Sequence, residues 1–172
     1  MNEAMCNLCT SLLLCFFAET GKHHIGTICL VSVYGNIDSY EGVTIRDDEE
    51  LLYTRELCLQ NIIYKLAGKA ATEMVFGVAD QGCENDVRKA GDMVRRMADD
   101  LCCLGFDSYV FCDPSPYSLE NRERQVAMEM ERCYRKAKEI IAQNRGKLDA
   151  LTEALLKQKT LLSDDVAKIM AR

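Results

Sequence analysis

Apolar residues crowd the first segment of the chain and then recur at intervals typical of helices and strands. Residues from about Asn2 to Ala18 read as a helix, and nearly every position in its second half is apolar, which predicts burial over most of its circumference. The β-branched run Ile25 to Tyr34 predicts a strand, and Tyr40 to Arg46 follows a Gly35-Asn36 turn as its partner. We therefore expect a β-hairpin, or small sheet, near the N-terminal helix.

Helical spacing dominates the rest of the chain. Leucine and isoleucine recur at this spacing from Asp48 to Gly68, and a second apolar face runs from Glu84 to about Leu104. After a break at CDPSP, Ser118 is the expected N-cap of a long charged helix that ends near Asn144. The predicted fold class is α+β, mostly α.

The expected long helix carries an apolar stripe that must be covered. The stripe consists of Val126, Met130, Cys133, Tyr134, Ala137, Ile140 and Ile141, and a charged side holds Glu129, Glu131, Arg135, Lys136 and Glu139. Four later leucines are the expected cover, with a second subunit as the alternative: Leu148, Leu151, Leu155 and Leu156. Ser163, followed by Asp164 and Asp165, is expected to cap a final short helix.

Composition excludes several classes of function. The net charge of −6 provides no basic stripe for nucleic acid. The apolar run Met5 to Ala18 falls short of the about 20 residues that a membrane span needs, so membrane association would arise only through partners. The 10 cysteines in a chain with ample apolar residues favour reduced thiols, and hence the cytoplasm or another reducing compartment.

Two blocks of sequence, Gly68 to Gly77 (GKAATEMVFG) and Gly82 to Val87 (GCENDV), follow one another after a short spacer. They resemble the peptidase domain of FtsH-type AAA zinc proteases: the first is similar to a helix end with its acidic pair, and the second to the Asn-Asp motif that follows it. The resemblance continues through Ala90 to Met97 and from Tyr117 to Met170, so it covers about two thirds of the chain. It implies a peptidase core over residues 1–116, with residues 117–172 as a C-terminal helical segment of the same domain.

That family holds zinc through HExxH, in which two histidines one helical turn apart bind the metal and the glutamate is the general base. This sequence contains no HExxH. The resemblance places Asp86 at the aspartate that is the third zinc ligand. In the preferred register, Asn2 to Cys6 (NEAMC) aligns with HExxH, and Glu3 occupies the general-base position. In the alternative register, Ala18 to Lys22 aligns with HExxH, and Glu19 occupies that position.

Neither register contains a histidine, so Asp86 and Cys6 are the residues left to face the former metal position. Catalytic zinc normally has three protein ligands, and two unlike ligands are too few. Without a metal-activated water, Glu3 has nothing to deprotonate. The two histidines, His23 and His24, are neighbours that would point in opposite directions in a strand.

We therefore expect a non-catalytic FtsH-like domain that binds protein or peptide, associates with itself or assembles with an FtsH-like protease. No cofactor is expected, and the sequence has no Walker-type phosphate loop, hence no ATP site in this chain. One alternative is a zinc metallopeptidase with unusual ligands. Another is a metal or redox sensor that uses Cys6, Cys9 and the Cys102-Cys103 pair.

Overall fold

The computed structural model describes residues 54–78, 83–106, 114–158 and 160–171, and the backbone of four short strands nearer the N-terminus. Its helices are α2 (Arg55–Phe76), α3 (Glu84–Asp99), α4 (Pro116–Gln143), α5 (Arg145–Gln158) and α6 (Ser163–Met170). Its strands are β1 (Ile25–Cys29), β2 (Val33–Tyr34), β3 (Ser39–Tyr40), β4 (Val43–Arg46) and β5 (Thr160–Leu162). The predicted α+β, mostly helical class is confirmed, whereas the expected helix from Asn2 to Ala18 lies outside the described residues.

The strands form a small antiparallel sheet and a separate short pair. β1 lies between β4 and β5, so that Ile28 is opposite Thr44 on one side and Leu161 on the other. β2 pairs with β3. The predicted pairing of the two β-rich segments is thus confirmed, although each segment supplies two short strands. β5 was not predicted, because three residues are too few to show the alternation that marks a strand.

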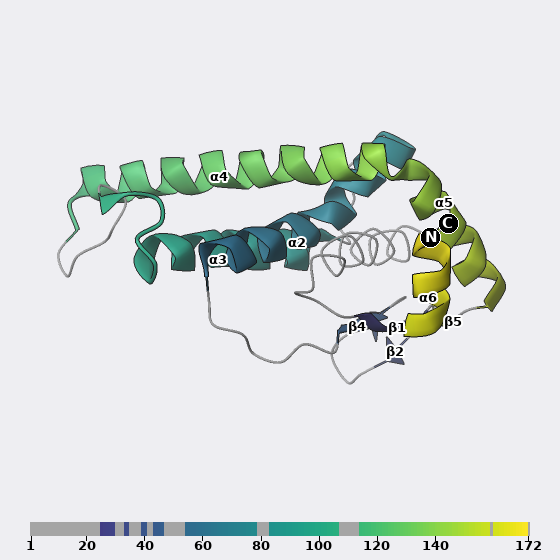
Figure 1. The fold of residues 1–172 in the computed structure, drawn as a ribbon. Coiled ribbons are helices and arrows are strands. Elements are labelled where there is room, and N and C mark those ends of the chain that lie inside the picture. Colours follow the sequence, from purple (N-terminus) through teal and green to yellow (C-terminus); the bar gives the residue numbers. More distant parts are fainter. Residues whose placement is uncertain are drawn as a thin grey trace.

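Helix α2 is the central helix of the described structure and packs against both α3 and α4. Figure 1 shows α2 running obliquely up to the end of α4 that leads into α5, with α3 beside α2 and with α5, α6 and the strands towards that end. Thr54 begins α2 by accepting a hydrogen bond from the Leu57 backbone N–H at 3.3 Å. Gly77 ends it in the left-handed conformation, with φ of 70°, and donates its N–H to the Glu73 carbonyl.

Two hydrophobic clusters share α2. The first joins the N-terminal half of α2 to α3 and α4, and its fully buried members are Cys58, Ile62, Ala90, Val94 and Met97. The second joins the C-terminal half of α2 to the end of α4 and to α5, β5 and α6, and its fully buried members are Ala67, Ala70, Ala71, Ala137, Ile141, Leu148, Leu151 and Leu161. The alanines let the helices approach closely, and the two clusters hold both ends of α2 in place.

The long helix α4 confirms the predicted stripe and corrects three details. Ser115, and not Ser118, is the N-cap, since its hydroxyl accepts the Ser118 backbone N–H at 3.1 Å. Glu129 was expected on the charged side but is buried, at 2.9 Å from Arg132. Leu156 was expected to cover the stripe but is exposed, because α2 supplies most of the cover.

Two other helix boundaries also differ from the sequence-based expectations. α3 ends at Asp99, before Leu104, and the chain then continues in turns. Ser163 was expected to cap α6 but is its first helical residue, so Leu162 is the N-cap, and the Asp165 carboxylate accepts the Leu162 backbone N–H at 3.3 Å. Among the described helices, none has the length and apolar character needed to cross a bilayer.

Candidate functional site

The residues of the two resemblance blocks meet where α2 ends and α3 begins. Thr72 is fully buried on α2, and its hydroxyl donates to the carbonyl oxygens of Gly68 and Lys69, at 3.2 and 3.0 Å. The same Oγ1 lies 4.0 Å from Sγ of buried Cys83, which directly precedes α3. This contact fixes the start of α3 against the end of α2.

Asp86 lies in the first turn of α3, as predicted, and is half-buried. Its carboxylate is favourably placed there, because the partial positive charge of a helix N-terminus attracts anions. Within the described part of the chain, Asp86 has no hydrogen bond or ion pair. Its neighbour Asn85 accepts a hydrogen bond from Arg88 at 2.8 Å and so belongs to the surface of the same helix.

Glu73 is held by three donors from two helices. Lys69 of α2 and the Tyr134 hydroxyl of α4 donate hydrogen bonds to its two carboxylate oxygens, and Lys138 Nζ of α4 lies 3.0 Å from Oε2. Both lysines also make cation–π contacts, since the Nζ atoms of Lys69 and Lys138 lie 5.3 and 4.5 Å from the centroid of the Tyr134 ring. Glu73 therefore ties α2 to α4.

These donors determine the charge state of Glu73. The hydrogen bond from Lys69, followed by that from Tyr134, lowers the pKa of the carboxyl from 4.5 to about 2, against a smaller opposing effect of burial. Burial and the bond to Glu73 raise the pKa of Tyr134. A carboxylate with so low a pKa is a poor proton acceptor at neutral pH, so Glu73 stabilises the fold and is not suited to general-base catalysis.

Most of the other predicted site residues lie outside the part of the chain that the structure describes. Glu3, Cys6, Cys9, Glu19, His23 and His24 lie outside the described residues, so their distance from Asp86 is untested. Among the residues that are described, no three of the types His, Cys, Asp and Glu converge as a metal-binding group. Cys102 and Cys103 are both half-buried, in the turn after α3.

Sequence reasoning missed the partners of Glu73 on α4. The Lys69–Glu73 pair could be read from its i, i+4 spacing on a helix. Tyr134 and Lys138 are more than 60 positions away, and Tyr134 was assigned only to the apolar stripe. No local pattern marks a contact between residues so distant in sequence.

The described structure is thus a helical domain in which α3, the helix that carries Asp86, packs against the central helix α2, and it also contains a small antiparallel sheet. Residues 38–110, which include both Glu73 and Asp86, match Peptidase family M41. Over these residues the chain is similar to the FtsH-type peptidase family.

Curated relatives extend the match over most of the chain. The ATP-dependent zinc metalloprotease FtsH of Thermotoga maritima is 29% identical over 73% of this chain and 23% of its own length. The protein of the same name from Bacillus subtilis is 29% identical over 79% of this chain and 24% of its own length. FtsH 3 of Petrotoga mobilis is 26% identical over 87% of this chain and 28% of its own length. The chain thus spans about a quarter of the length of these relatives.

Proposed function

We propose that this chain is a non-catalytic member of the FtsH-type peptidase family that acts as an assembly or peptide-binding scaffold. The observation that carries the proposal is the absence of HExxH: the sequence has two histidines, His23 and His24, and they are adjacent rather than one helical turn apart. A zinc ion in a catalytic site needs three protein ligands and an open position for water. By resemblance, Asp86 supplies one ligand and the histidine positions supply none.

The apolar surface beside this site supports a binding role. Met74 and Phe76, in the last turn of α2, and Val78, just after its C-cap Gly77, are all exposed. Three exposed large apolar side chains within five residues support a surface for contact with another protein. Such a surface serves contact with another protein whether or not a metal is bound nearby.

A peptidase assay with metal analysis tests the loss of catalysis. We expect purified protein to hold much less than one zinc ion per chain and to leave fluorescein-labelled casein uncleaved, with or without a chelator. Asp86→Ala should change neither result, and neither should Asp92→Ala, the matched change at an exposed position of α3. Full zinc occupancy with chelator-sensitive cleavage, abolished in Asp86→Ala but retained in Asp92→Ala, would establish the alternative of an active zinc peptidase.

A further inference from the structure

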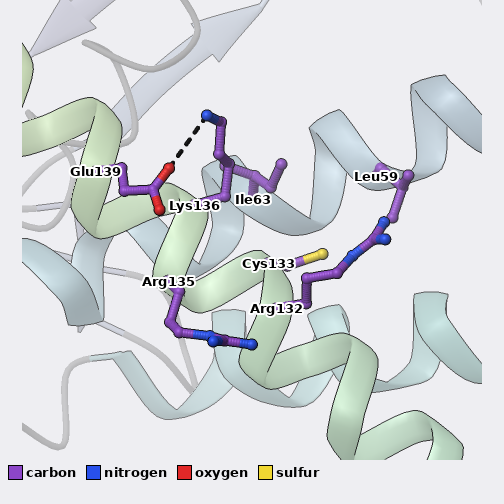
Figure 2. Close-up of a pocket in the computed structure, with 7 residues that line it drawn as sticks. All are labelled: Leu59, Ile63, Arg132, Cys133, Arg135, Lys136 and Glu139. Carbon is purple, nitrogen blue, oxygen red and sulfur yellow. Dashed lines mark hydrogen bonds and ion pairs between the residues drawn. The ribbon is translucent and has the colours of Figure 1, made fainter.

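A hollow of about 400 Å³ lies between α2 and α4, and neither Glu73 nor Asp86 is among the residues that line it. The described residues that line it are Leu59, Ile63, Arg132, Cys133, Arg135, Lys136 and Glu139 (Figure 2). Leu59 and Ile63 are one turn apart on α2, and the four charged residues share one face of α4. The volume falls at the small end of the range of about 300–1,000 Å³ typical of ligand sites.

The floor of the hollow is apolar and chemically inert. Leu59 and Ile63 are partly buried against the first hydrophobic cluster, and Cys133 is a buried member of it. Burial, followed by the charge of Glu129, raises the pKa of the Cys133 thiol to about 12. A thiol that stays protonated at neutral pH behaves as a small hydrophobic group rather than a nucleophile. The hollow is therefore suited to binding and not to thiol chemistry.

The rim of the hollow is cationic, and part of its charge is unmatched. Lys136 is paired with Glu139 at 3.2 Å, as the dashed line in Figure 2 marks. Arg132 lies 2.9 Å from Oε1 of buried Glu129, but that oxygen has no hydrogen bond of acceptable geometry. Arg135 is exposed and has no ion pair with another described residue. A planar guanidinium with open donors matches the two oxygens of a carboxylate.

We propose that this hollow binds a carboxylate carried on an aliphatic group, supplied by the C-terminal end of an apolar peptide. The aliphatic side chains would lie on Leu59, Ile63 and Cys133, and the terminal carboxylate would contact Arg135. The Glu139 side chain is 59% exposed and pairs with Lys136 through Oε2, so its Oε1 can accept a peptide N–H, which a fatty acid lacks. This inference rests on the proposed binding role and names the chemistry of the ligand.

Fluorescence anisotropy with a labelled Gly-Gly-Leu-Leu peptide tests the proposal. The peptide with a free C-terminal carboxylate should bind, and its amidated form should bind at least about tenfold more weakly, because a charge-assisted hydrogen bond is lost. Arg135→Glu should weaken binding of the free-carboxylate peptide by a similar factor. Arg124→Glu makes the same charge change at an exposed position about 16 Å away on α4 and should leave binding within twofold.

Three results would overturn the proposal: equal binding of the amidated peptide, equal loss in Arg124→Glu and Arg135→Glu, or Arg135-dependent binding of octanoate with no binding of the peptide. Circular dichroism of both variants checks that the helices are intact. The zinc and casein assays do not involve this hollow. If the peptide does not bind, the proposed loss of catalysis is unaffected. If the protein cleaves casein, the anisotropy experiment still decides whether Arg135 binds the peptide.

Discussion

Glu73 is the residue through which charge contributes most clearly to the fold. Its folded-state pKa of about 2 lies below the ordinary 4.5, so its ionised form is preferentially stabilised in the native state. That contribution is fully present above about pH 4.5 and is lost as the pH falls towards about 2. The carboxylate thus favours a close approach of α2 and α4 at neutral pH and ceases to do so in acid.

Glu73→Gln keeps the size of the side chain and removes its charge. We expect the variant to lose about 1–3 kcal/mol of unfolding free energy at pH 7, since hydrogen bonds to a charged group are weakened. The difference from the parent protein should narrow as the pH falls from about 4.5 towards 2. Urea unfolding at a series of pH values measures it.

Glu153→Gln is the matched control for this change. Glu153 also pairs with a lysine one turn later, Lys157, at 2.6 Å, but both side chains are 70% exposed. Its removal should leave the urea midpoint unchanged, because exposed ion pairs contribute little. A difference between Glu73→Gln and the parent that stays constant from pH 7 to pH 2.5 would contradict the assigned role of the Glu73 charge.

At the scale of the elements, the ends of the helices depend on single residues. Gly77 has φ of 70°, and no atom outside its immediate neighbours lies within 4 Å of the Cβ that an alanine would add. The cost of Gly77→Ala is therefore conformational, about 1 kcal/mol. Gly91→Ala is the control, because Gly91 lies inside α3, where alanine is favoured over glycine by a similar amount.

Chemical denaturation of the two glycine variants should shift the midpoints in opposite directions, with Gly77→Ala less stable and Gly91→Ala more stable than the parent. Destabilisation by Gly91→Ala alone would mean that contact with Arg95, whose Nη1 lies 3.5 Å from the new Cβ, outweighs helix propensity. No loss in Gly77→Ala would show that α2 does not end in a left-handed residue.

The sequence predicted that these helices form, but it predicted their first and last residues less well. The apolar spacing of α2, α3 and α4 identified each helix, because one face of each is buried over several turns. The start of α4 was misplaced by three residues, although Ser115-Pro116 carries the usual signal of a cap followed by proline at the first helical position. Ser118 was chosen because it also precedes a leucine and a glutamate, and the structure shows it inside the first turn.

At the scale of the whole molecule, the packing partners are what the sequence could not supply. The apolar stripe on α4 was correctly identified. Its main cover is α2, which precedes α4 in the sequence, and not the following helix α5 alone. Leu148, Leu151 and Leu155 do pack on the second cluster, whereas Leu156 is 56% exposed. Asp86 was placed at a helix start by its motif, while the clamp around Glu73 arises from contacts between distant segments.

Two of the four leucines of α5 test this assignment of the core. Leu151→Ala removes a fully buried side chain and should cost about 2–5 kcal/mol of unfolding free energy. Leu156→Ala, on the same helix, should cost less than about 0.5 kcal/mol. Equal losses measured by urea unfolding would indicate that a second subunit covers Leu156, which light scattering at the same protein concentration would reveal as a larger particle.

The most direct test of the central claim is the zinc affinity of four proteins: the parent chain, Asn2→His, Cys6→His and the double variant. We predict weak binding in the parent and in each single variant, because the ligands act together, and much tighter, near-stoichiometric binding in the double variant, where two histidines join Asp86. Stoichiometric zinc in the parent chain, lost on Asp86→Ala, would contradict the claim that this chain lacks the family's metal site.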